Sequence, residues 1–347
     1  MPARTRPASA RLRSVASAAA LLAAFGLAGC ATAAPSDPTP SAADDTDSSV
    51  PAGALVLDPT ADYGDEYADG ILPVGDGLWS LTDAEVGTVL LCREPNDQAG
   101  GAFQRGPWFV NGDTEYDIGL KVEVQGEVTW ENSMSITVDD GIRTVSTNDL
   151  PDHATGEFPI SPSDPAYDYD RNPNPISEQS LEYRLTADPE YGEPQCMGGE
   201  SGVMLTGVAL FNAFDATGRD AGAWETQDGC EGHPELTGEY HYHTLSSCIG
   251  AVGVDTVIGF ALDGFPIAGP TVSAGNVLTT ADLDECHGIV SDIELDGEVV
   301  TSYHYVMTQD FPYSVSCFRA EPIRVGGSGG APAAGPPGAA GEVAHDH

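Results

Sequence analysis

The chain has 347 residues, of which 13 are basic and 54 are acidic, so its formal net charge is −41. So large a negative charge repels phosphate backbones and anionic lipid headgroups, which argues against nucleic acids and acidic membrane surfaces as partners. The 41 glycines and 26 prolines interrupt helices and favour a fold of strands and turns.

The first 30 residues have the pattern of a secretory signal. Four arginines precede a short apolar run at residues 15–27, which ends in Leu-Ala-Gly-Cys with the cysteine at position 30. A basic start, an apolar centre and small residues before a cleavage site are typical of exported chains. The run is too short to span a membrane, which needs about 20 apolar residues. The ending is similar to a bacterial lipobox, which implies cleavage after residue 29 and lipidation of Cys30; the alternative is ordinary cleavage.

This interpretation divides the chain into four segments. Residues 1–29 form the signal, and residues 30–54, rich in Ala, Pro, Ser, Thr and Asp, form a disordered stalk. Residues 55–325 form one folded domain, and the Gly, Ala and Pro of 326–347 form a disordered tail. A diacylated cysteine would tether the domain to the cell membrane on its extracytoplasmic face.

Strand signals dominate the predicted domain. Short runs of alternating or continuous apolar residues are bounded by turn signals such as Asp139-Asp140-Gly141 and Asp296-Gly297. No segment after the signal has the period of a long helix. We therefore predict an all-β domain, a single large sandwich or barrel with long irregular loops and stapling disulfides. The predicted strands include two alternating runs around Gly126 within 120–130, followed by 133–138, 142–147, 181–186, 203–211 and 257–262.

Six cysteines remain when Cys30 is set aside. In an exported chain they predict three disulfides, for which several pairings are possible. Short separations favour Cys230–Cys248 and Cys286–Cys317 as local links, which would leave Cys92–Cys196. If all six are paired, no free thiol is expected as a nucleophile or metal ligand.

Histidines gather in the last third of the chain. The tetrapeptide at 240–243 reads Tyr-His-Tyr-His. On a strand, His241 and His243 would share one face with Cβ atoms roughly 6.6 Å apart, a spacing at which two imidazoles can converge on one ion. His304 stands between two tyrosines in a similar patch, and His233 precedes the tetrapeptide by a short loop.

The histidine pattern predicts a site for one zinc or copper ion. The expected ligands are His241, His243 and His304, with His233 as the fourth. Three imidazoles with an open position are typical of catalytic zinc, whereas four protein ligands close the site. The alternative is that these histidines serve only the fold and donate hydrogen bonds to loop carbonyls.

A catalytic site of this kind would use a metal-bound water as its nucleophile. Glu239 and Asp263, which lie near the motifs in the sequence, are the carboxylates expected to take the proton. The sequence names no substrate, so whether the protein is an enzyme stays open.

Several short blocks accompany the histidine motif. Together they resemble the YHYH-domain proteins, a family without an established activity. The resemblance covers about residues 88–325 and implies a single domain; it implies no reaction. Glu231 and Ala268 depart from the pattern of the family, and neither is an expected ligand. The blocks begin at Gly101, Gly106, Asp164, Tyr169, Gly207, Gly232, Leu262, Asp284, Tyr303 and Phe311.

Three classes of function are compatible with the sequence. The first is a metal-dependent envelope protein, either a hydrolase or a metal carrier. The second is a non-enzymatic module that binds a glycan or another envelope polymer, for which exposed tryptophans would supply a stacking surface. The third is a structural or adhesion domain. The oligomeric state cannot be derived from the sequence. The four tryptophans are Trp79, Trp108, Trp130 and Trp224.

Overall fold

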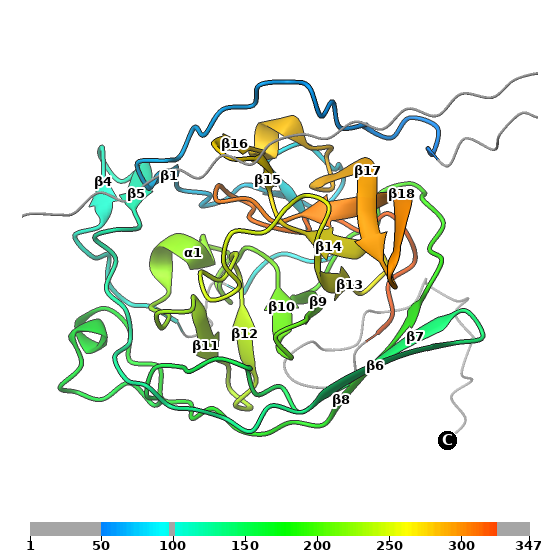
Figure 1. Cartoon of the computed structure of the whole chain (residues 1–347). Coiled ribbons are helices and arrows are strands. Elements are labelled where there is room, and N and C mark those ends of the chain that lie inside the picture. The colour runs from blue at the N-terminus through cyan, green and yellow to red at the C-terminus, as the bar shows by residue number, and fades with distance from the viewer. Residues whose placement is uncertain (1–49, 97–100, 325–347) are drawn as a thin grey trace, which may run out of the picture. The chain divides into compact units, whose positions relative to one another are not determined.

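The computed structural model describes residues 50–96 and 101–324 (Figure 1). The predicted signal, Cys30, most of the predicted stalk and the predicted tail lie outside the described residues. Val50 and Ala54 already pack against the main core, before the predicted domain boundary at residue 55. Within the described ranges, no helix combines the length and the hydropathy needed to cross a membrane.

Strands dominate the described chain, as predicted for an all-β domain. The largest sheet has the order β11-β12-β10-β9-β13-β14-β18-β17. It runs in Figure 1 from the yellow-green strands to the orange ones, and its described strands form an open sheet, which fits a sandwich-like fold and not a barrel. The strands are β9 (Glu200–Met204), β10 (Ala209–Phe211), β11 (Gly232–Pro234), β12 (Tyr240–Tyr242), β13 (Val257–Ala261), β14 (Pro266–Ala268), β17 (Gly288–Leu295) and β18 (Glu298–Val306).

Smaller elements surround this sheet. Two three-stranded sheets have the orders β1-β5-β4 and β6-β7-β8, and two pairs are β2-β3 and β15-β16. The one α-helix of the described residues is the single turn α1 (Ala221–Trp224). Short 3-10 turns occur at Pro165–Asp168 and Thr280–Asp282. The strands are β1 (Ile71–Pro73), β2 (Trp79–Ser80), β3 (Val89–Leu90), β4 (Phe109–Val110), β5 (Glu115–Asp117), β6 (Met134–Asp139), β7 (Ile142–Thr147), β8 (Leu181–Thr186), β15 (Thr271–Ser273) and β16 (Asn276–Val277).

The Asp-Gly turns lie where the sequence predicts hairpins. Asp140 and Gly141 join β6 to β7, and Asp296 and Gly297 join β17 to β18. All four have positive φ, the conformation that tight hairpin turns require.

Two predicted strands are wrong in detail. At 120–130 the chain makes only single bridges, at Val124 and Val128, because Gly126 between them adopts a φ of 135° against the backbone of Glu157. The predicted run 203–211 contains two antiparallel strands, since Gly207 with a φ of 96° turns the chain back.

The two halves of the large sheet repeat one topology. In the first half β9 pairs antiparallel with β10, β10 lies parallel to β12, and β12 pairs antiparallel with β11. In the second half β13, β14, β18 and β17 follow the same scheme. The halves meet where β9 and β13 pair antiparallel, with Val203 opposite Phe260. The sheet therefore has an approximate internal two-fold axis.

Equivalent positions in the two halves carry the same residues and contacts. Asp228 accepts hydrogen bonds from the Tyr240 hydroxyl and from backbone amides of the turn after it. Asp284 does the same with Tyr303 and its own turn. Gly207 and Gly264 share a φ of 96°. The pairs are Gly207 and Gly264, Asp228 and Asp284, Cys230 and Cys286, Gly232 and Gly288, Tyr240 and Tyr303, His241 and His304, and Tyr242 and Tyr305.

The disulfides of the described chain follow the predicted pairing. They are Cys92–Cys196, Cys230–Cys248 and Cys286–Cys317. The second and third begin at equivalent cysteines of the two halves. Each closes a loop that carries the outer hairpin of its half, so each holds the edge of the sheet in place.

Candidate metal centre

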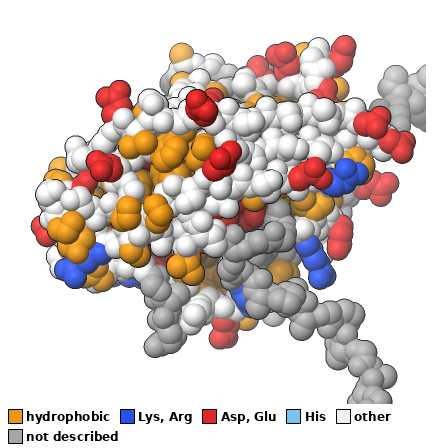
Figure 2. Space-filling model, turned by 90° about the horizontal axis from the view of Figure 1, so that it is seen from below, with side chains coloured by type: hydrophobic (Ala, Val, Ile, Leu, Met, Phe, Trp, Pro, Cys, Tyr) orange, Lys and Arg blue, Asp and Glu red, His pale blue; other side chains and the backbone are white. Residues whose placement is uncertain are grey.

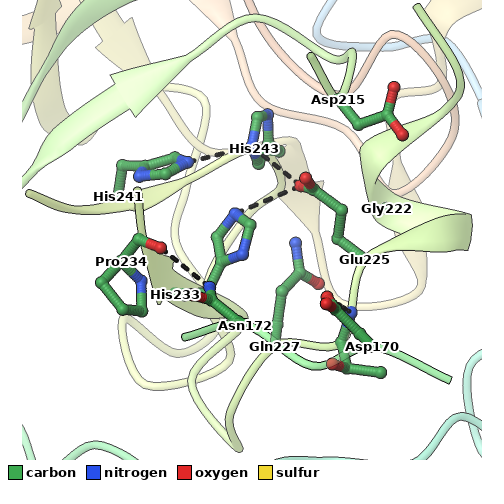
Figure 3. A network of polar contacts seen from close by, with 12 residues as sticks. Asp170, Asn172, Asp215, Gly222, Glu225, Gln227, His233, Pro234, His241 and His243 are labelled. Carbon is green, nitrogen blue, oxygen red and sulfur yellow. Dashed lines mark hydrogen bonds and ion pairs between the residues drawn. The ribbon is translucent and has the colours of Figure 1, made fainter. Parts of the chain in front are cut away.

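Three histidines converge at one end of the first half of the sheet (Figure 3). The antiparallel pairing of β11 and β12 places His233 directly opposite His241. His243 follows β12 directly, two residues after His241, where strand alternation turns its ring to the same side. One ligand atom from each ring lies within 4.8 Å of the other two. All three histidines are buried, and none is visible on the face shown in Figure 2, over which acidic side chains are spread.

Backbone carbonyls fix the tautomers of two of these rings. His241 Nδ1 lies 3.2 Å from the Glu239 carbonyl, and His243 Nδ1 lies 2.5 Å from the Asn212 carbonyl. A carbonyl oxygen only accepts, so each Nδ1 carries the proton. The two Nε2 atoms, 3.1 Å apart, then point their lone pairs at one another. Two lone pairs facing each other in a buried site need a proton or a cation between them.

Glu225 lies beside two of the three rings. It follows α1 directly, and its Oε2 lies 3.2 Å from His233 Nε2 and 3.3 Å from His243 Nε2. These are ion-pair distances, but the angles do not make hydrogen bonds, so Glu225 Oε2 and both ring nitrogens of His233 are buried without a hydrogen-bond partner. Buried polar atoms without partners mark a place where an ion or a water belongs.

The electrostatics of the cluster suit metal ligands. Burial lowers the pKa of His241 well below its usual value, and His233 and His243 lower it further, which keeps this ring neutral. Burial opposes charge on Glu225 and His233 as well, but their mutual attraction outweighs it. The pKa of Glu225 therefore lies well below its usual value, and that of His233 lies above it. A metal ion would take the place of the His233 proton opposite the carboxylate.

Three of the six separations among these four side chains match those around a tetrahedral ion, while the group of ligand atoms that all lie within 4.8 Å of one another consists of the three histidines. Metal–ligand bonds of 2.0–2.1 Å require about 3.3 Å between neighbouring ligand atoms of a tetrahedron. The observed separations within the cluster are 3.1 Å, 3.2 Å and 3.3 Å. Three imidazoles and one carboxylate are a donor set for zinc or copper. If Glu225 joined the three imidazoles around one ion, the site would be closed and not of the open catalytic type.

Neighbouring groups hold the ligands in position. The ring of Phe211 stacks on His241 with centroids 4.1 Å apart. On the side of Glu225, Lys121 donates to the Gly222 carbonyl and to Gln227 Oε1. Burial lowers the pKa of this lysine to about 8, although several carboxylates near it favour its charged form.

His304 is not brought into this cluster. It lies on β18 in the other half of the sheet, where its Nδ1 is 3.1 Å from the Ser302 carbonyl and its Nε2 is 3.4 Å from Ser291 Oγ. Burial lowers its pKa to about 4. It is the counterpart of His241, and Ile289 stands opposite it where His233 stands in the first half. The resemblance of the two motifs reflects the repeat and not a shared ion.

Neither carboxylate that the sequence predicts as a proton acceptor belongs to this group of ligand atoms. Asp263 accepts hydrogen bonds from the Tyr305 hydroxyl and the Arg319 amide in the second half. Glu239 reaches the cluster through its backbone carbonyl. Glu225, which the sequence analysis missed, lies 16 positions before His241 and carries no motif of its own.

The tryptophans do not form a stacking surface. Trp108 and Trp224 are buried, while Trp79 and Trp130 pack partly buried against the main core. A shallow groove beside β6 and β7 is lined by hydroxyl, amide and carboxylate groups such as Ser135 and Asn148, and in the described chain its lining includes no aromatic side chain. Among the described residues, the tryptophans and this groove thus offer no aromatic stacking surface.

Comparison with known protein families assigns one region of the chain. A profile of the family described as YHYH protein matches residues 182–277. The chain contains a YHYH domain. The match begins within β8 and ends with β16, so it includes Glu225 and the three clustered histidines. Hence the matched region contains the first half of the sheet, strands β13 and β14 of the second half, and the candidate metal centre. Comparison with curated proteins and with solved structures gave no significant match.

Proposed function

We propose that this protein binds one transition metal ion, zinc or copper, in a closed site formed by His233, His241, His243 and Glu225. The observation that carries the proposal is the convergence of three buried imidazoles, whose ligand atoms lie within 4.8 Å of one another, with a Glu225 oxygen 3.2 Å and 3.3 Å from two of them. Without a cation this arrangement leaves buried polar atoms without partners, which is costly.

The internal repeat supports a role beyond the fold. The second half has the same topology, and its aspartate, glycine, cysteine and tyrosine positions match those of the first. Three of the proposed ligands have no counterpart there. Ile289 replaces His233, Val306 follows Tyr305 where His243 follows Tyr242, and Ala281 stands three residues before Asp284 as Glu225 stands before Asp228. The fold therefore does not need these three polar side chains.

Metal content is the direct test. The full chain should be purified without chelator or nickel affinity and measured by mass spectrometry, alongside a His241→Ala/His243→Ala variant and a His304→Ala control. We expect about one zinc or copper per chain in the parent and the control, and none in the double variant. Equal metal in all three, or none after incubation with excess zinc and copper, would contradict the proposal.

We also propose that the domain is exported and anchored to the membrane by a lipid on Cys30. The signal pattern and the lipobox-like ending support it. The disulfides of the described chain agree with an oxidising compartment. A Cys30→Ser change should move the protein from the membrane fraction to the soluble extracytoplasmic fraction. Retention in the membrane fraction would count against lipidation.

A further inference from the structure

A second group of ligand atoms contains the disulfide Cys230–Cys248, which encloses the segment with the Tyr-His-Tyr-His motif. A ring nitrogen of His153 and the sulfurs of Cys230 and Cys248 all lie within 4.8 Å of one another. As a disulfide, the two sulfurs are not thiolate ligands. Cys248 is exposed and His153 is half-buried, so a small reductant can reach this disulfide. Cys286 and Cys317, the disulfide of the other half, are both fully buried.

The two cysteines would stay adjacent after reduction because other bonds hold their loops together. The Ser247 amide donates to the Glu231 carboxylate at 2.7 Å, and the Ser247 hydroxyl donates to the Gly229 carbonyl at 3.1 Å. The Cys230 amide donates to Asp228 at 2.9 Å. These contacts do not depend on the bond between the sulfurs.

His153 is held at the site in the same way. Its Nδ1 lies 2.9 Å from the Ala154 carbonyl, and its Nε2 is hydrogen-bonded to the Tyr242 hydroxyl. Its ring packs against those of Tyr240 and Tyr242 at centroid distances of 6.1 Å and 6.0 Å. A metal ion would replace one of its two hydrogen bonds with a coordinate bond.

We propose that reduction of Cys230–Cys248 creates a second metal site, formed by two thiolates and the imidazole of His153. A dithiol reductant gives two electrons and two protons to the disulfide, which becomes two thiols, while the reductant closes to its own disulfide. A divalent ion such as zinc then displaces the two thiol protons. Two thiolates, one imidazole and a water are a four-coordinate set for zinc. This site shares no ligand with the proposed His-Glu centre and does not depend on it.

Cobalt absorption tests this proposal. The full chain carrying Cys30→Ser is reduced with a dithiol, separated from it without oxygen, and titrated with Co²⁺, since thiolate ligands give cobalt a charge-transfer absorption. We expect this absorption in the reduced protein and none in the oxidised protein. His153→Ala should weaken cobalt binding at least about tenfold. His241→Ala/His243→Ala should leave the absorption unchanged, which separates this site from the other centre.

A Cys230→Ser/Cys248→Ser variant completes the test, because it keeps the other two disulfides. It should lose the absorption after reduction. The proposal is overturned if the reduced parent shows no thiolate–cobalt absorption, or if the absorption is as strong in this double variant. If the double variant does not fold, His153→Ala, which keeps all disulfides, decides alone: unchanged cobalt affinity overturns the proposal.

Discussion

Glu225 decides whether the candidate centre is a ligand set or only a group of buried histidines. Its carboxylate oxygen lies within 3.3 Å of two imidazole nitrogens and has no hydrogen-bond donor of its own. A structural carboxylate would normally accept hydrogen bonds, as Asp228 and Asp284 do. The lack of a hydrogen-bond donor to the Glu225 oxygen thus supports the proposal that this oxygen coordinates a metal ion.

A Glu225→Gln change tests this role. The amide keeps the size of the side chain but removes the negative charge, so we expect zinc affinity to fall about 10- to 100-fold. Competition with a chromophoric chelator measures the affinity. His304→Ala, in the matching position of the other half, should leave it unchanged. An unaltered affinity in Glu225→Gln would remove the carboxylate from the ligand set.

Glu200 gives a pH dependence that is separate from the metal. Its Oε1 is buried without a partner, and burial raises the pKa of Glu200 to about 8, with Glu239 adding to the shift. A raised pKa in the folded state stabilises the fold below pH 4.5, the usual value, and this contribution is lost as the pH rises through about 8.

A Glu200→Gln change should therefore flatten the pH profile. Relative to the parent, the variant should be more stable at pH 9 than at pH 5, because the parent alone must bury a charge at high pH. Urea unfolding at both pH values measures this difference. A constant difference across the range would show that Glu200 does not titrate as described.

At the level of elements, the outer hairpins β11–β12 and β17–β18 occupy equivalent positions, so the same mutation can be compared in both. In each, a glycine lies against a tyrosine ring. A Cβ at Gly232 would lie 2.2 Å from Tyr240 ring and hydroxyl atoms, and a Cβ at Gly288 would lie 2.2 Å from the Tyr303 hydroxyl. Neither neighbour can move freely, since both tyrosines are buried and hydrogen-bonded.

Gly232→Ala and Gly288→Ala should each lower the free energy of unfolding by about 1–3 kcal/mol through overpacking. Gly232→Ala alone should also reduce metal occupancy, because it displaces the adjoining His233. Thermal unfolding and metal analysis of both variants give the two readouts. Equal metal loss in both variants would contradict a centre confined to the first half.

Local signals predicted the parts of the fold that local chemistry controls. Asp-Gly pairs marked two hairpin turns because their positive φ values suit these residues. Short separations between cysteines marked two disulfides, and the third followed. Alternation placed His241 and His243 on one face. Apart from Cys92–Cys196, which followed by elimination, each of these depends only on residues close in the sequence.

The remaining features depend on contacts between distant segments. Glu225 reaches His233 and His243 because the chain that follows α1 lies beside these two rings, which no spacing in the sequence reveals (Figure 3). His304 carries the same tyrosine-flanked motif as His241, so the sequence could not show that it belongs to the other half. The internal two-fold axis itself became evident only from the strand register.

For the whole molecule, the proposed ion in only one half would make stability depend on metal. An ion that binds the folded state at a thousand times its dissociation constant adds about 4 kcal/mol to the free energy of unfolding. A strong chelator should therefore lower the melting temperature, and added zinc should restore it. The His241→Ala/His243→Ala variant should respond to neither. An identical melting temperature of the parent with chelator and with zinc would argue against bound metal.

The most direct measurement is anomalous X-ray diffraction from crystals of the protein grown with zinc, recorded above and below the zinc absorption edge. We predict one peak between the Nε2 atoms of His241 and His243, within bonding distance of His233 and Glu225, and none at His304. A difference map with no peak at this position would contradict the proposed centre.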